Sequence, residues 1–214
     1  MSEAEPTDAP AARRPILPPH VVMTDFLPPD VAAALYAYAL ANESRFEPSS
    51  VGYGEGLRID PACRLSVVLR DLGPFKQQLR DRLAPLAPAL SAQLKTSQFE
   101  ITRIELELAA HGDGAFFERH LDTHRGAATA KMYRILSGVY YFHAQPKAFG
   151  GGALRLHELL PASSERRFLD IEPAHNTLVA FPSWMPHEVL PVSCSSQRFA
   201  DSRFAINCWF YRAR

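Results

Sequence analysis

The sequence predicts an α+β fold that is mainly β, in which helices near the N-terminus support a β sandwich or barrel. Apolar residues recur at helical spacing in two stretches before residue 99. Beyond it, seven or eight short strand-like segments are separated by Gly, Pro and Asn turns. No linker-like stretch separates the two parts, so we expect one domain over residues 20–214, long enough for a sizeable core.

The first 98 residues are expected to form a tail and a helical support. Residues 1–19 are rich in Pro and Ala and lack the apolar stretch of a secretory signal, which favours a flexible tail. Residues 20–98 form the support, in which Pro85 and Pro88 should kink or divide the second helix. In order, the support should contain a strand at 20–27, a helix at 30–43, a strand at 64–72 and a helix at 73–94.

The β core is expected over residues 99–212. Its first strand, at 99–110, intersperses apolar residues with Glu and Arg, as in a strand with one buried face. The other strand-like segments are 116–124, 132–143, 152–158, 166–172, 176–181, 187–193 and 202–212.

Charge and cysteine content narrow the functional classes. Lys+Arg and Asp+Glu both number 23, so net charge gives no reason to expect a nucleic-acid or anionic-membrane partner. No apolar run reaches the roughly 18 residues that span a membrane. Cys63, Cys194 and Cys208 are too widely spaced for a zinc site or a disulfide framework. We therefore expect a cytoplasmic protein without nucleic-acid or membrane partners; the sequence assigns no oligomeric state.

His120, Asp122 and His187 are candidate metal ligands. Within the strand-like stretch 116–124, His120 and Asp122 lie two positions apart and would share one side. His187 follows Pro186, where an apolar stretch meets a turn. Two imidazoles and one carboxylate on a β framework form the facial triad typical of non-haem Fe(II) oxygenases, which leaves coordination positions open.

Arg203 lies at the start of the last strand-like segment. One face of that strand would carry Arg203, Ala205, Asn207 and Trp209, and both faces are mostly apolar, as in a central strand. A buried guanidinium needs a partner, because an isolated buried charge is costly. Either an internal Asp or Glu neutralises Arg203, or Arg203 clamps the carboxylate of a ligand.

The chain resembles the Fe(II)/2-oxoglutarate-dependent oxygenases, particularly their prolyl 4-hydroxylase-like branch, over about residues 99–212. The matching segments are, in order, "RHLDTH", "SGVYYFH", "FGGGALRLHE", "DIEPAHNTLVAFPSWMPHEVLPV" and "SRFAINCWF". The resemblance implies a double-stranded β-helix, or jelly-roll. It also implies that His120, Asp122 and His187 bind Fe(II), and that Arg203 binds the distal carboxylate of 2-oxoglutarate.

The resemblance implies further contacts to the cosubstrate. The matching positions are Tyr141, Ser137 and Val139 on the strand after H-x-D, Asn207 and Trp209 on the arginine strand, and Leu154 after "GGG". O₂ is the second cosubstrate, and ascorbate is a candidate auxiliary reductant. The implied reaction couples oxidative decarboxylation of 2-oxoglutarate to hydroxylation of a substrate C–H bond, with peptide and small-molecule substrates both open.

Two positions depart from the family pattern. Arg203 follows His187 by more residues than is usual, and Arg198 lies closer to the usual spacing. Only Arg203 opens an apolar strand ending in Trp, so we expect Arg198 on a lengthened surface loop. Ala110 stands where some protein prolyl hydroxylases have a tyrosine, so their substrate preference does not transfer.

Three alternatives remain. A nucleobase-repair dioxygenase is disfavoured by the neutral charge and by Trp209, which stands where such enzymes tend to carry a second arginine. A cupin-type metalloenzyme fits H-x-D poorly. A catalytically silent jelly-roll binding module is disfavoured by the complete triad, because a decayed enzyme would be expected to lose a ligand.

Overall fold

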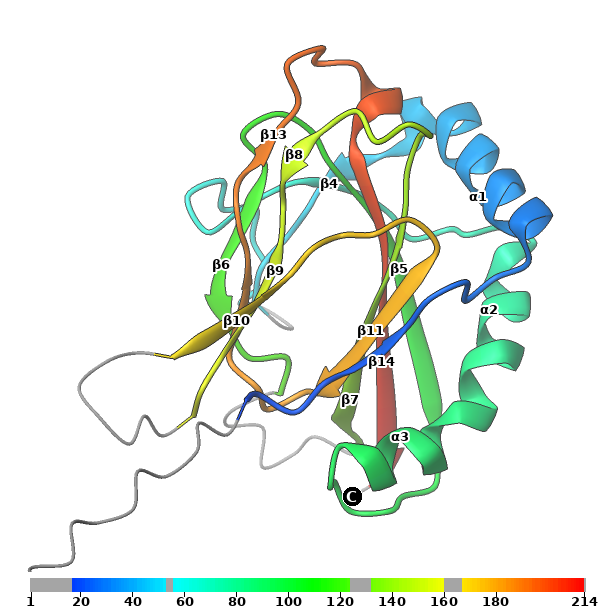
Figure 1. Ribbon diagram of the computed structural model, residues 1–214, viewed down its shortest axis with the longest axis vertical. Coiled ribbons are helices and arrows are strands. Elements are labelled where there is room, and N and C mark those ends of the chain that lie inside the picture. Colours follow the sequence, from blue (N-terminus) through cyan, green and yellow to red (C-terminus); the bar gives the residue numbers. More distant parts are fainter. Residues whose placement is uncertain (1–16, 53–55, 124–131, 160–166, 214) are drawn as a thin grey trace, which may run out of the picture.

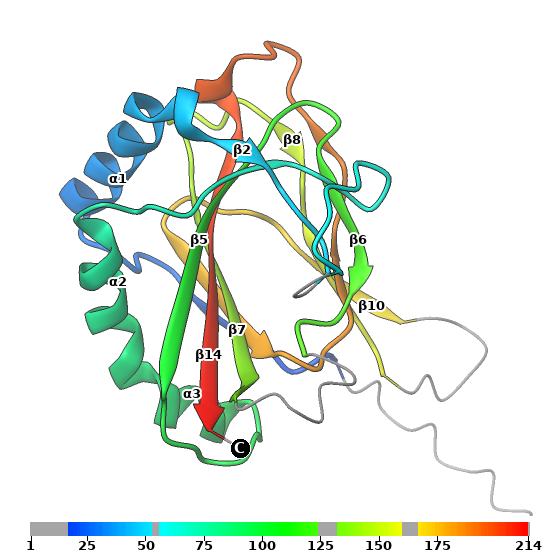
Figure 2. The ribbon, with the colours of Figure 1, turned by 180° about the vertical axis from the view of Figure 1, so that it is seen from behind.

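The computed structural model describes residues 17–52, 56–123, 132–159 and 167–213, in which two β sheets face each other and helices line one side (Figures 1 and 2). The larger sheet has seven strands and is antiparallel throughout. Its spatial order is β1 (Val21–Met23), β11 (Thr177–Pro182), β7 (Met132–Phe142), β14 (Arg203–Ala213), β5 (Arg103–His111), β4 (Val67–Leu69) and β2 (Glu47–Pro48).

The smaller sheet has five antiparallel strands. Its spatial order is β10 (Phe168–Ile171), β9 (Leu154–His157), β12 (His187–Val189), β6 (Phe116–His120) and β3 (Arg64–Leu65), and a separate pair joins β13 (Val192–Ser193) to β8 (Gly150–Gly151). From β5 onward the chain passes repeatedly between the larger and the smaller sheet. The larger sheet contains β5, β7, β11 and β14, and the smaller sheet contains β6, β9, β10 and β12. This winding confirms the expected double-stranded β-helix.

Helices cover the outer face of the larger sheet (Figure 1). They are α1 (Pro29–Ala41), α2 (Phe75–Leu83) and α3 (Ala87–Gln93), and short 3-10 turns occur at η1 (Glu43–Arg45), η3 (Ala84–Leu86) and η4 (Phe199–Asp201). Proline divides the expected second helix into α2, η3 and α3, because Pro85 and Pro88 lack the amide hydrogen that an α-helix requires. Leu35, Leu79 and Leu83 are fully buried against the sheet.

β14 is the central strand of the larger sheet, paired with β7 on one side and β5 on the other. Phe204, Ile206, Cys208 and Phe210 belong to the core beneath the helices, whereas Ala205 belongs to a second core between the sheets. The alternation expected from the sequence is therefore confirmed. It gives the strand one face toward the helices and one toward the space between the sheets.

Two expectations for the elements were too simple. The segment 20–98 is more than a helical support, because β1, β2 and β4 join the larger sheet and β3 joins the smaller one. The expected strand at 116–124 ends as β6 at His120. Most of the expected tail lies outside the described residues. None of the helices within the described part of the chain has the length and apolar character to cross a bilayer.

Candidate metal centre and adjoining cavities

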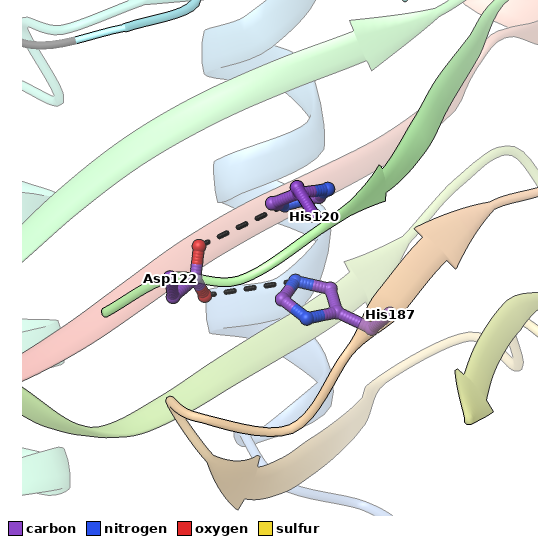
Figure 3. Close-up of side chains that lie close together, drawn as sticks. All are labelled: His120, Asp122 and His187. Carbon is purple, nitrogen blue, oxygen red and sulfur yellow. Dashed lines mark ion pairs between the residues drawn. The ribbon is translucent and has the colours of Figure 1, made fainter. Parts of the chain in front are cut away.

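His120, Asp122 and His187 converge at the rim of the smaller sheet (Figure 3). His120 is the last residue of β6, and His187 is the first residue of β12. The two residues lie directly opposite each other in the antiparallel pair that these strands form. The Nε2 atoms of His120 and His187 lie 3.8 and 3.7 Å from the two carboxylate oxygens of Asp122. One potential ligand atom from each residue lies within 4.8 Å of the other two, which is the spacing that a single metal ion needs.

Asp122 does not reach this position by sharing one side of a strand with His120, as its two-residue spacing from His120 suggests. The strand ends before Asp122, so alternation within a strand does not place its side chain beside His120. A bend after β6 turns the chain inward, where the Asp122 amide donates to the Ser183 carbonyl at 3.1 Å. The Ser137 hydroxyl donates to Asp122 Oδ2 at 2.6 Å. Contacts with β7 and with the residues just after β11 therefore fix the carboxylate.

Backbone carbonyls orient both histidines. His120 Nδ1 lies 2.7 Å from the Glu118 carbonyl, and His187 Nδ1 lies 2.9 Å from the Met185 carbonyl. A carbonyl can only accept, so each Nδ1 carries the hydrogen and each Nε2 presents a lone pair toward Asp122. Metal-binding histidines are commonly held in this way, with the second ring nitrogen donating to a fixed acceptor.

The electrostatics favour a neutral His120 imidazole beside an ionised Asp122 carboxylate. Burial, with a smaller effect of His187, lowers the pKa of His120 to about 3. For Asp122, burial opposes ionisation, but the two histidines and the hydrogen bond from Ser137 outweigh it, so its pKa lies below the usual value. These protonation states are the ones in which imidazole and carboxylate bind metals.

Arg203, the first residue of β14, is 1% exposed. Its Nε donates to the Gly152 carbonyl at 2.8 Å, and its guanidinium carbon lies 4.9 Å from the centre of the Tyr141 ring. Within the described residues it forms no ion pair, and both its Nη2 and the Tyr141 hydroxyl are buried without a hydrogen-bond partner. Arg198 is 72% exposed and pairs with Asp201, so it lies on the surface, as expected.

Two adjoining cavities meet at His120 and Asp122. An outer cavity of about 500 Å³ and a narrow inner pocket of about 40 Å³ share Arg64, Phe117, His120, Asp122 and Trp209. The inner pocket continues inward past His187 to Arg203. A small ligand in the inner pocket can therefore lie between the triad and Arg203, while a larger one approaches from the outer cavity.

The other residues singled out from the sequence fall into two groups. Val139, Leu154 and Asn207 line the inner pocket, together with Trp209. Ser137 and Tyr141 do not line it and act from behind: Ser137 contacts Asp122, and the Tyr141 ring lies against Arg203.

Sequence reasoning missed several residues of the cavities. Arg64 is 7% exposed, pairs with Glu107 at 2.8 Å, and lies over the Phe117 ring, which in turn stacks on His120 at 3.6 Å between ring centres. His111 lies beside Arg203 in the inner pocket. Strand alternation places His111 on the face opposite to Ala110, which faces the core beneath the helices, but only the pairing of β5 with β14 brings His111 beside Arg203. No sequence signal points to Arg64.

A model of a known family matches the chain over residues 106–211, and its description is the 2OG-Fe(II) oxygenase superfamily. An uncharacterised PKHD-type hydroxylase of Synechocystis sp. is 38% identical over 135 residues, which cover 61% of this chain and 44% of that protein. The chain thus spans less than half the length of that relative.

Solved structures show the same fold. A prolyl-4-hydroxylase of Pseudomonas putida superposes with a TM-score of 0.65 at 24% identity, over 92% of this chain and 94% of that one. A prolyl hydroxylase of Trichoplax adhaerens, solved with a peptide fragment of a hypoxia inducible factor, gives a TM-score of 0.64 at 19% identity. That match covers 90% of this chain and 83% of the other.

Proposed function

This chain belongs to the 2OG-Fe(II) oxygenase superfamily, and we propose that it is a hydroxylase that couples oxidative decarboxylation of 2-oxoglutarate to hydroxylation of a substrate C–H bond. The convergence of His120, Asp122 and His187, the first two of which line both cavities, is the observation that carries this proposal. The family uses Fe(II), 2-oxoglutarate and O₂.

The three converging residues have the donor set of an Fe(II) site. Two imidazoles and one carboxylate match the facial triad of non-haem iron oxygenases. Hydrogen bonds from Ser137 to Asp122, and from both histidine rings to carbonyls, hold the donors in place before any metal binds. We therefore assign His120, Asp122 and His187 as the iron ligands.

Arg203 is the proposed partner of the distal 2-oxoglutarate carboxylate. A fully buried guanidinium with an unpartnered Nη2 is costly, and a ligand carboxylate would supply both the missing charge and the missing acceptor. The Tyr141 ring lies against the same guanidinium, and its buried hydroxyl also lacks a hydrogen-bond partner among the described residues. Val139, Leu154, Asn207 and Trp209 would form its walls.

When bound, iron and 2-oxoglutarate supply the oxidising chemistry, in which O₂ and 2-oxoglutarate yield succinate, CO₂ and one oxygen atom for the substrate. The chain supplies position and exclusion of water. Arg203 and the triad fix the two ends of the inner pocket, and Leu154 and Val139 keep its walls apolar. The outer cavity is large enough to bring a substrate side chain to the open side of the triad.

A peptidyl side chain, prolyl or other, is the substrate class that we favour, with free amino acids and small metabolites as the alternative. The outer cavity is open, and the charged side chains of Arg58, Arg70 and Glu118 line its exposed part. The similar Trichoplax enzyme was solved with a peptide fragment. A reducing compartment such as the cytoplasm is part of this proposal, because Cys63, Cys194 and Cys208 are all free.

The proposal is tested by adding 2-oxoglutarate to the anaerobic protein loaded with Fe(II). We expect a weak visible charge-transfer band in the wild type and in Arg198→Ala, and little or no band in Arg203→Ala at the same concentration. If Arg198→Ala is the damaging change, the assignment of Arg203 is wrong. If the wild type takes up iron but never gives the band, the chain is a silent jelly-roll module. Succinate release with +16 Da products in a mass-spectrometric substrate screen would then identify the target.

A further inference from the structure

The partners of Arg203 are unusual for a fully buried cation. Within the described residues, the hydrogen-bond and ring partners of its guanidinium are all neutral: the Gly152 carbonyl, the Tyr141 side chain and the His111 ring. Buried arginines are normally paired with an acid, because desolvation of the charge is otherwise uncompensated. The fold therefore holds a positive charge at the end of the inner pocket and leaves it without a counter-ion of its own.

His111 is the side chain that takes the place of an acid. It is the last residue of β5, lies directly opposite Arg203 in the β5–β14 pair, and is 3% exposed. Its Nδ1 lies 3.3 Å from Arg203 Nη1. A guanidinium can only donate, so His111 Nδ1 accepts and its hydrogen lies on Nε2. Burial and the charge of Arg203 also hold the pKa of His111 well below its usual value, so the ring is neutral.

The position of Arg203 leaves little freedom for other arrangements. Gly152 has φ of +70°, and a Cβ at this position would lie 2.6 Å from Arg203 Cδ. The arginine stem therefore packs directly on the backbone of residue 152. With Nε bound to the Gly152 carbonyl and Nη1 to His111, Nη2 is the nitrogen left without a partner.

We propose that His111 is a positioning residue for the cosubstrate: a neutral acceptor that orients Arg203 without neutralising it, so that the full charge remains for a ligand carboxylate. This inference rests on the proposed function, because the ligand is taken to be 2-oxoglutarate. An Asp or Glu at residue 111 would satisfy the guanidinium better than histidine does. Such an acid would also compete with the ligand carboxylate for the Arg203 guanidinium. A neutral partner of Arg203 at residue 111 is therefore required for ligand binding and not for folding.

Substitution of His111 by Asn and by Asp, which are nearly isosteric with each other, separates the orientation of Arg203 from the neutralisation of its charge. In His111→Asn, the side-chain oxygen can occupy the position of Nδ1 and accept from Arg203 without adding charge. In His111→Asp, the same position carries a charged acceptor. The dissociation constant of 2-oxoglutarate is measured by titration of the anaerobic Fe(II)-loaded protein, through the visible band and by calorimetry. We expect His111→Asn to bind within about 3-fold of wild type and His111→Asp to bind at least about 100-fold more weakly.

Between His111→Asn and His111→Asp, stability should change in the direction opposite to that of 2-oxoglutarate affinity. His111→Asp pairs with Arg203, so its melting temperature is expected to equal or exceed that of His111→Asn even though binding is lost. His111→Leu, which has no acceptor, gives a third point, with affinity reduced about 10-fold by the loss of one hydrogen bond to a charged group. If His111→Asp does not fold, the pair His111→Asn and His111→Leu still decides whether a neutral acceptor is needed.

A ligand control tests whether the effect belongs to the distal carboxylate. 2-Oxopentanoate has the keto acid end of 2-oxoglutarate but no second carboxylate, so its binding should be the same in wild type, His111→Asn and His111→Asp. His157→Gln is the matched protein control, because His157 is also a buried histidine but pairs with Glu188 and lines neither cavity. It should bind 2-oxoglutarate as the wild type does.

The outcomes distinguish this inference from the function on which it rests. If the wild type binds no 2-oxoglutarate, the proposed function fails. If the wild type binds it and His111→Asp binds equally well, His111 is only a packing residue and the inference alone is wrong. Equal losses in His111→Asn and His111→Asp would also overturn it, because charge would then not be the property that matters.

Discussion

The two faces of β14 have opposite characters. Toward the helices, Phe204, Ile206, Cys208 and Phe210 are each at most 1% exposed and pack in a continuous apolar core. Toward the space between the sheets, the same strand presents Arg203, Asn207 and Trp209 to the inner pocket. One strand thus stabilises the fold with one set of side chains and forms the pocket with the other.

The difference has an energetic meaning. Burial of a Phe or Ile side chain contributes about 1.5–3 kcal/mol to stability, so the helix-facing side accounts for much of the strand's contribution. Among the described residues, the pocket-facing side buries a charge without an acid partner and leaves donors unsatisfied, which opposes folding. The two faces should therefore respond differently to substitution, and the following predictions test that separation in order of decreasing effect.

The largest effect is expected on the pocket side, at His187. Removal of a residue that supports a ligand usually costs 10–100-fold in metal affinity, so His187→Ala should lose more than about 100-fold in Fe(II) affinity and retain less than about 1% of turnover. The thermal midpoint of the metal-free protein should change little, because the imidazole is removed from the edge of a cavity. Metal titration, succinate release and calorimetry measure the affinity, the turnover and the thermal midpoint. A variant that binds iron normally would show that the triad is not the metal site.

The helix-facing side should show the reverse. Ile206→Ala creates a cavity in a fully buried core, and we expect it to lower the free energy of unfolding by about 2–5 kcal/mol while 2-oxoglutarate affinity stays within about 2-fold. The matched control is the next residue, Asn207→Ala, which is half-buried on the other face. Its loss of stability should not exceed about 1 kcal/mol. Urea unfolding measures both, and similar losses in the two variants would remove the distinction between the faces.

The sequence predicted the two faces of β14 well, because a central strand of mostly apolar residues imposes a two-residue period from its own side chains. It also pointed to all three converging residues, through H-x-D and the distal histidine. It gave the wrong reason for Asp122, which lies beyond the end of β6 and is placed by contacts with Ser183 and Ser137. Those contacts come from other strands and have no local signature.

The residues that the sequence did not reveal are those defined by pairing across strands. His111 matches no ligand spacing, and only the register of β5 against β14 brings it to Arg203. Arg64 opens the strand expected at 64–72, but only the pairing of β3 with β6 brings its side chain over Phe117. Register between distant strands depends on the whole sheet, so single-sequence patterns do not determine it.

Ser137 offers an intermediate test on the pocket side of β7. Its hydroxyl donates to Asp122 Oδ2 and also contacts the Ser183 hydroxyl at 2.8 Å. Ser137→Ala should weaken Fe(II) binding about 10–100-fold, because an outer partner of a metal-binding carboxylate is lost. Ser91→Ala, at an equally buried serine in α3, should leave metal affinity unchanged. Equal affinities in the two variants would show that Asp122 does not depend on Ser137 for its position.

The smallest expected effect is a dependence of stability on pH that originates at His111. The pKa of His111 lies well below 6.5 in the folded protein, because the ring is buried beside Arg203 and near Arg64. An unfolded histidine titrates near 6.5, so below that pH the unfolded chain takes up a proton that the folded chain does not. Stability is therefore lost as pH falls, by at most about 1.4 kcal/mol per unit, and is insensitive to this residue above about pH 7.5.

Comparison of wild type with His111→Asn isolates that contribution. Arg203 and Arg64 remain charged throughout, and the other titratable groups of the inner pocket, His120, Asp122 and His187, are present in both proteins. Urea unfolding of the metal-free proteins between pH 7.5 and 5 should therefore show the wild type losing its stability relative to His111→Asn as the pH falls. Parallel curves would mean that the His111 ring is already protonated in the folded state, or free to become so. In that case the pocket face of β14 would not hold the uncompensated charge of Arg203 beside a neutral ring.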